Sequence, residues 1–119
     1  MSTIDLDQCT DGGRVHNLAG KDWGQRVRNQ LNIDDMDLND EIVNVKIPSH
    51  VYAVSPSFFL GLFSRSLDTL GGREGFLRKY NFSVSEAVRE QVLDGILDWE
   101  YRSKVIENPH TFLGIKIRK

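Results

Sequence analysis

Hydrophobic and polar positions along the chain follow two periods, and the clearest example of each lies beside the other. Glu41–Ile47 contains apolar, mostly β-branched side chains and predicts a central strand that ends at Pro48. In Ser57–Leu70 the apolar side chains instead recur at helical spacing, which predicts a helix. Gly71 and Gly72 then follow, as is typical of a helix C-terminus.

Two further helices are predicted, one before and one after this pair. The first follows Gly20, where apolar side chains share one face: Trp23, Val27 and Leu31. The second covers about Val84–Val105, with an apolar stripe made of Val88, Val92, Leu93, Ile96 and Trp99. Ser83 and Glu86 fit a capping box at its start. Gly95 in its interior predicts a close approach between this helix and the sheet.

The remaining segments have shorter patterns. Residues 3–6 predict a first strand, and after a glycine turn residues 14–16 predict the second arm of a hairpin. Residues 32–40 are rich in aspartate and predict a solvated connection. Three more elements are predicted: a short helix over Gly75–Tyr80, a strand or extended segment at Asn81-Phe82, and a final segment, Thr111–Ile117, that pairs as an edge strand or docks on a partner.

Together these elements predict an α/β domain with a single-layer mixed sheet of about four strands backed by three to four helices. The chain has 119 residues, of which 39% are hydrophobic and 27% charged, as expected for one globular domain. We expect a single domain over residues 1–119, with its core at about 3–105 and a C-terminal extension at 106–119.

The net charge, the cysteine content and the lack of long apolar runs limit the classes of partner and the location that we expect. A net charge of −2 argues against a general nucleic-acid binder and against attraction to an anionic membrane. Cys9 is the only cysteine, so an intramolecular disulfide is excluded. The first residues lack the features of a signal peptide, and no apolar run approaches ~18 residues. We therefore expect a cytoplasmic protein without a membrane partner.

No set of residues has the spacing of a catalytic or metal site. His16, His50 and His110 are not placed at metal-ligand spacing. The aspartates of residues 32–40 lack the glycine and glutamate of a calcium-binding loop. Nothing in the sequence fixes Cys9 against a histidine as nucleophile and base. We therefore expect no enzymatic activity, no metal and no cofactor.

Two arginines beside glycines are candidate anion contacts. Arg14 follows Gly12-Gly13, and Arg73 lies in the run from Gly71 to Gly75. That run follows a helix and lacks the Lys-Ser/Thr ending of a phosphate-binding P-loop, which favours a helix cap. A nucleotide or small phosphate-ligand binding domain is therefore kept as an alternative function.

The start of the helix over residues 57–70 is the strongest candidate for a functional site. Ser55 is expected to cap the helix, and Pro56 to take the first helical position. Ser57 then lies in the first turn, near free backbone N–H groups. Its hydroxyl either anchors the helix or carries a regulatory phosphate, which would add about −1.5 to −2 charges.

Two stretches of the chain resemble the STAS-like family, which is related to sulfate-transporter and anti-sigma-factor-antagonist domains of bacteria and phages. The first contains Gly12-Gly13-Arg14, Gly20 and Gly24-Gln25-Arg26-Val27-Arg28. The second contains Ile42–Ile47, Ser55-Pro56-Ser57-Phe58-Phe59 and Gly61-Leu62-Phe63. The resemblance continues through Leu70-Gly71, Phe76 and Tyr80–Phe82, and covers about residues 3–105.

The resemblance implies a mixed sheet backed by helices and a regulatory protein without enzymatic activity. In the anti-sigma-factor antagonists a kinase phosphorylates the second serine of an Asp-Ser-Ser-Gly turn, and Ser57 falls at that position. Ser55, Pro56 and Phe58 replace the other three residues. The implied partner is a kinase-like ATPase or an anti-sigma-type regulator that contacts Ser55, Ser57 and Phe58. A homodimer and a phage-encoded inhibitor of a host defence complex are further alternatives.

Overall fold

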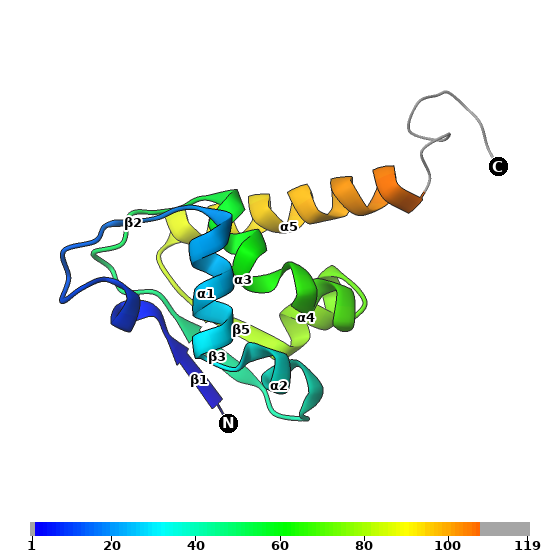
Figure 1. Ribbon diagram of the computed structural model, residues 1–119, viewed down its shortest axis with the longest axis horizontal. Coiled ribbons are helices and arrows are strands. Elements are labelled where there is room, and N and C mark those ends of the chain that lie inside the picture. The colour runs from blue at the N-terminus through cyan, green and yellow to red at the C-terminus, as the bar shows by residue number, and fades with distance from the viewer. Residues whose placement is uncertain (1, 108–119) are drawn as a thin grey trace.

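The computed structural model describes residues 2–107 as an α/β fold (Figure 1). Along the chain the elements are β1 (Ser2–Asp5), the 3₁₀ turn η1 (Leu6–Cys9), β2 (Asn17–Leu18), α1 (Lys21–Gln30), α2 (Ile33–Leu38), β3 (Val43–Lys46), β4 (Ala53–Val54), α3 (Pro56–Thr69), α4 (Arg73–Lys79), β5 (Tyr80–Ser83) and α5 (Glu86–Glu107). The predicted helices and the central strand are confirmed, with small shifts of their ends. The segment Thr111–Ile117 and His110 lie outside the described residues.

The sheet is parallel throughout the described residues, so the predicted mixed sheet is wrong. Three strands pair in the order β1-β3-β5, with Ile4 beside Val45 and Val45 beside Phe82. A second, two-stranded sheet pairs β2 with β4, where Leu18 lies beside Val54. The predicted hairpin is also wrong. Its second arm is replaced by β2, because the chain continues past the glycine turn instead of pairing back on β1.

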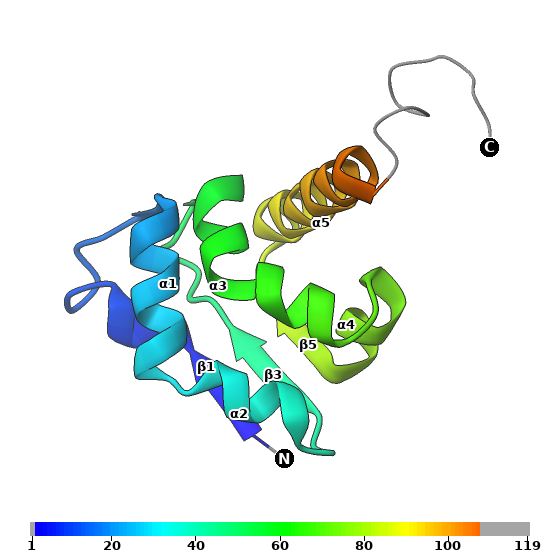
Figure 2. The same cartoon turned by 45° about the vertical axis from the view of Figure 1, so that its right-hand side comes forward.

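The helices cover one face of the three-stranded sheet (Figure 2). Alternate strand residues, including Ile4, Val45 and Phe82, are buried beneath them, whereas Asp5 and Lys46 point to the opposite, exposed face. Helix α3 packs against α1 on one side and α5 on the other. The core is rich in aromatic rings: the centroid of Phe63 lies 5.1 Å from those of Phe76 and Tyr80.

Glycines let three helices come unusually close together. A Cβ atom on Gly24 of α1 would overlap the carbonyl oxygen of Phe58, and one on Gly61 of α3 would overlap the carbonyl oxygen of Lys21. Gly95 of α5 lies against the ring of Phe59. The close approach predicted at Gly95 therefore exists, but it joins α5 to another helix and not to the sheet.

A buried polar network corrects the prediction that residues 32–40 are a solvated connection. Ile33–Leu38 form α2, and within it Ile33 and Asp37 are buried, Asp37 being only 6% exposed. Arg28 of α1 is 4% exposed and donates to Asp37 Oδ2 at 2.6 Å. It also donates to the backbone oxygen of Leu62 at 2.8 Å and to Ser66 Oγ at 2.9 Å. These bonds supply acceptors to a charge that could not otherwise be buried.

Two side chains extend this network. The Tyr80 hydroxyl donates to Asp37 Oδ1 at 2.6 Å, and burial together with this hydrogen bond raises the pKa of Tyr80. Asp34 accepts from Arg28 Nε at 2.8 Å, and this bond lowers the pKa of the Asp34 carboxyl. The network thus ties α1, α2, α3 and β5 together.

Caps set the ends of two helices. Gly71 and Gly72 have φ values of 82° and 109°, and the Gly72 N–H donates to the Leu67 oxygen at 2.9 Å, as in a Schellman motif. At the start of α5 the predicted capping box is wrong. Ser83 ends β5, and it is Ser85 Oγ that accepts from the Val88 N–H at 3.2 Å.

Candidate functional site

The first turn of α3 has the predicted cap. Ser55 Oγ accepts a hydrogen bond from the Phe58 backbone N–H at 3.0 Å, and Pro56 takes the first helical position. The Ser55 backbone N–H donates to the Leu18 oxygen at 2.8 Å, which fixes the helix start against β2. The N-cap prediction is therefore confirmed at Ser55.

Ser57 lies where the sequence placed it, in the first turn of α3. Its side chain is exposed, and its Oγ lies 3.0 Å from Ser55 Oγ. The hydroxyl is therefore accessible to a macromolecule and is adjacent to the cap of the helix. Its phosphorylation stays a prediction.

Phe58 corrects the prediction of a partner contact at that position. Its side chain is 0% exposed and packs edge-on against Trp23, with ring centroids 5.4 Å apart. The reason is the close crossing of α1 and α3, which covers this side of the first turn. In this structure the Phe58 side chain contributes to the core and is not accessible to a partner.

The two candidate anion-binding arginines are not brought to the start of α3. Arg73 donates from Nε and Nη2 to the Glu100 carboxylate at 3.1 and 3.0 Å, and these hydrogen bonds raise the pKa of Arg73. This bidentate pair joins α4 to α5. Arg14 lies in the exposed loop after η1, where its Nη1 is 3.8 Å from an Asp11 carboxylate oxygen. Neither arginine is among the residues that line the groove described next.

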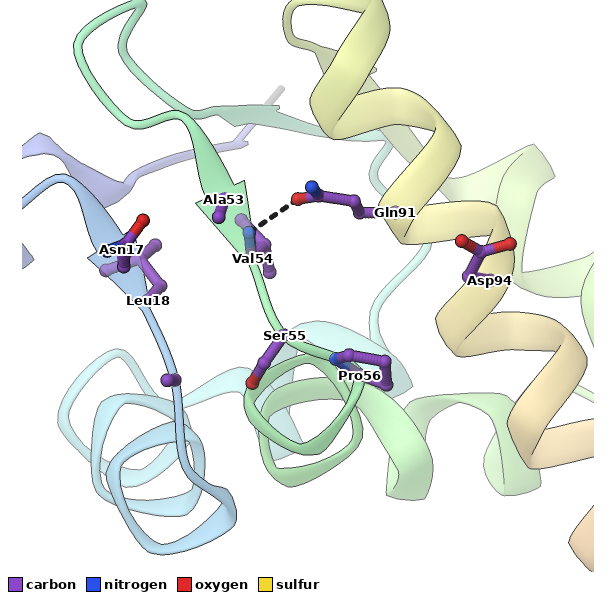
Figure 3. A pocket seen from close by; sticks show the side chains of 9 residues that line it. Asn17, Leu18, Ala53, Val54, Ser55, Pro56, Gln91 and Asp94 are labelled. Carbon is purple, nitrogen blue, oxygen red and sulfur yellow. Dashed lines mark hydrogen bonds between the residues drawn. The ribbon is translucent and has the colours of Figure 1, made fainter.

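A groove of about 200 Å³ lies at the start of α3, and we call it the α3 groove (Figure 3). Residues from β2, β4, α3 and α5 line it, among them Asn17, Leu18, Val54, Pro56, Gln91 and Asp94. Its inner surface is mainly apolar, and polar side chains stand around it (Figure 3). Ser55 also contributes to the lining, so the capping residue of α3 belongs to this groove.

Gln91 connects α5 to the strand side of the α3 groove. Its Oε1 accepts from the Val54 backbone N–H at 2.6 Å, on the side of β4 that faces away from β2 (Figure 3). The side-chain amide thereby occupies a sheet edge that would otherwise need another partner. Asp94, one turn later on α5, is exposed and supplies the only formal charge among the lining residues.

The contribution of α5 to the α3 groove was not predicted from the sequence. Gln91 and Asp94 are three residues apart and share the polar side of that helix. That spacing was the only available signal, and it does not reveal that the polar side faces β4 and the start of α3. The contact depends on two segments 37 residues apart in sequence.

Two histidines meet elsewhere, at the loops that follow β1 and β3. His16 Nδ1 lies 2.7 Å from the backbone oxygen of His50, so Nδ1 is the protonated nitrogen, and Tyr52 stacks on the His16 ring with centroids 5.2 Å apart.

Burial raises the pKa of the Cys9 thiol, which is the opposite of what a nucleophile requires. Within residues 2–107 no three His, Cys, Asp or Glu side chains are grouped so as to hold a metal ion.

Comparisons with known proteins add no relative. No family model, curated protein or solved structure matches this chain. Among the helices in the described part of the chain, none is both long and apolar enough to cross a membrane.

Proposed function

We propose that this protein is a non-enzymatic regulatory module that binds a protein partner through the α3 groove and the exposed first turn of α3. One observation carries the proposal: the accessible Ser57 hydroxyl is coupled through Ser55 to a groove built from four different elements. The STAS-like resemblance supports the same region and favours a kinase-like ATPase or an anti-sigma-type regulator as the partner.

The chemistry of the α3 groove specifies what a partner would present. Leu18, Val54 and Pro56 offer apolar surface, while Asp94 offers one negative charge at the α5 side. A small apolar side chain with a neighbouring lysine or arginine fits both features. The partner segment is therefore expected to be basic next to its apolar anchor.

A phosphate on Ser57 would act on the same surface. It would place a dianion at the N-terminus of α3, where the helix dipole favours negative charge, so the fold would tolerate it. The same charge would change the potential beside the α3 groove and therefore the affinity for the partner. This gives the hydroxyl a regulatory role without a catalytic one.

The test begins with affinity purification from the native host, followed by binding measurements with the purified partner. Ser57→Asp and Asp94→Lys are each expected to change the affinity about tenfold or more, because each alters a charge at the contact. Asp40→Lys is the matched control, since Asp40 is exposed and belongs to the loop before β3. Affinities equal to that of the unmodified chain for both site variants would overturn the proposal.

The alternative of a nucleotide or phosphate ligand has less support. Arg73 is engaged by Glu100, and Arg14 is 82% exposed and lies 3.8 Å from the carboxylate of Asp11. A thermal-shift series with nucleotides would favour this alternative only if the melting temperature rose with ligand concentration.

A further inference from the structure

Helix α5 exposes a line of side chains on the face that is turned away from the core. These residues, which we call the α5 stripe, repeat at heptad spacing and are all exposed: Ala87, Glu90, Asp94, Leu97 and Tyr101. The opposite side of the helix supplies Val88, Val92 and Ile96 to the core. The stripe is therefore a second, separate face of an already packed helix.

The α5 stripe is divided into an acidic half and an apolar half. Glu90 and Asp94 give the half near the helix start two negative charges. Leu97 and Tyr101, one turn apart, are 54% and 55% exposed in the other half. Large apolar side chains exposed together at helical spacing are typical of a surface that another segment covers.

Contacts on the other side of α5 fix the direction in which the stripe points. Trp99 Nε1 donates to Asp68 at 3.0 Å, and the Arg73–Glu100 pair joins the helix to α4. The second half of α5 extends away from the sheet (Figures 1 and 2). This anchored helix therefore presents Leu97 and Tyr101 on a rigid support.

A second copy of the chain matches at most the apolar half of the α5 stripe. Antiparallel pairing of two stripes about Leu97 would set Tyr101 of each copy against Asp94 of the other, whereas pairing about residue 99 would set Leu97 against Tyr101 and leave both acidic halves without a basic neighbour in the stripe. Parallel pairing would set Glu90 and Asp94 against their equivalents, and like charges repel. The occupant should instead carry apolar residues at one end and basic residues at the other.

Residues 108–119 of this chain have that composition in the required order. They come after Glu107, and their first two residues, Asn108-Pro109, are a sequence that favours the end of a helix. Apolar residues come next, namely Phe112, Leu113 and Ile115, and the basic residues come last, namely Lys116, Arg118 and Lys119. We propose that this segment turns back and binds the α5 stripe of its own chain in the antiparallel direction.

The lengths are compatible with this arrangement. From Glu107 back to Glu90 the helix rises about 26 Å, at about 1.5 Å per residue. Residues 111–119, after a turn at 108–110, span about 30 Å when extended, at about 3.3 Å per residue. The apolar residues of the segment thus reach Tyr101 and Leu97, and the basic residues reach Asp94 and Glu90.

This inference does not require that the α3 groove has a partner, although Asp94 belongs to both surfaces. In the proposed state residues 116–119 neutralise the charge that the groove would offer to a partner. The experiment below measures whether residues 108–119 bind the α5 stripe within one molecule. A negative result there is therefore distinguishable from a failure of the α3 groove to bind a partner.

Zero-length carbodiimide cross-linking of the full chain tests the proposal. An equal mixture of ¹⁴N- and ¹⁵N-labelled protein is cross-linked, digested and analysed by mass spectrometry. We expect amides that join Lys116 or Lys119 to Glu90 or Asp94, all of one isotope. Mixed-isotope products would assign the segment to a second copy and overturn the proposal. Equal yields at Asp35 and Glu74, which are exposed carboxylates on other helices, would overturn it as well.

A pair of variants tests the apolar half of the contact. Leu97→Gln is expected to lower the yield of the Lys116 and Lys119 cross-links about fivefold, because part of a leucine burial is lost. Leu77→Gln is the matched control, because Leu77 is 38% exposed on α4. Circular dichroism of both variants checks that the fold is retained. Equal yields for the two variants would show that no specific apolar contact exists and would overturn the proposed docking.

Discussion

Replacement of Asp37 by alanine tests whether the buried polar network stabilises this fold. Asp37 accepts hydrogen bonds from Arg28 at 2.6 Å and from the Tyr80 hydroxyl at 2.6 Å. Asp37→Ala would leave a guanidinium that is 4% exposed without its buried carboxylate, and a buried hydroxyl without its acceptor. Removal of one partner of a buried pair costs about 3–5 kcal/mol.

Arg28 keeps other hydrogen-bond acceptors in Asp37→Ala, and these determine how much of the free energy of unfolding is lost. The guanidinium of Arg28 still donates hydrogen bonds to Asp34, Ser66 and the backbone oxygen of Leu62, so part of its charge stays compensated. We therefore expect the free energy of unfolding to fall by about 3 kcal/mol, at the lower end of the range. Urea titration followed by circular dichroism measures it.

Two controls make this prediction specific. Asp35→Ala, at an exposed position in the same helix, should change the free energy of unfolding by no more than about 0.5 kcal/mol. The triple variant Arg28→Met, Asp37→Leu, Tyr80→Phe removes the charges and the hydroxyl together and should recover most of the loss. A loss below about 1 kcal/mol for Asp37→Ala would refute the reasoning that the network is both buried and coupled.

Three further predictions concern the other contacts described above. Ser55→Ala removes the side-chain acceptor of the Phe58 N–H and should lower the unfolding free energy by about 1 kcal/mol, measured by urea titration against exposed Ser49→Ala. Gly61→Ala should lower it by about 2 kcal/mol, because a Cβ atom there overlaps backbone of α1, which outweighs the gain in helix propensity; Arg26→Ala, at an exposed position of α1, should show no comparable loss. Because the pKa of Tyr80 is raised in the folded state, its contribution to the free energy of unfolding is fully present below the unfolded tyrosine pKa of about 10. That contribution is lost as the pH rises above this value toward the folded-state pKa. The melting temperature between pH 8 and about 11 should therefore fall less steeply for Tyr80→Phe than for the unmodified chain, and parallel curves would contradict the raised pKa that burial and the bond to Asp37 produce.

The local rules that a sequence obeys predicted the elements of this protein well. Strand β3, helix α3, its Ser55 cap and the glycines that end it all depend on residues within one or two turns of each other. Such signals are contained in a short window of sequence. The α/β class followed from the order of these elements.

Only the tertiary structure decided how the elements pair and which side chains become buried. The same polar residues, Arg28 and Asp37, are compatible with a solvated face or a buried pair, and the crossing of α1 with α3 selects the pair. Likewise β1 bonds to β3, about 40 residues later, instead of to the next segment. Gln91 reaches Val54 because α5 packs on α3. Hydrophobic periodicity specifies which face of a helix is apolar, but the neighbours of its polar residues depend on contacts between distant segments.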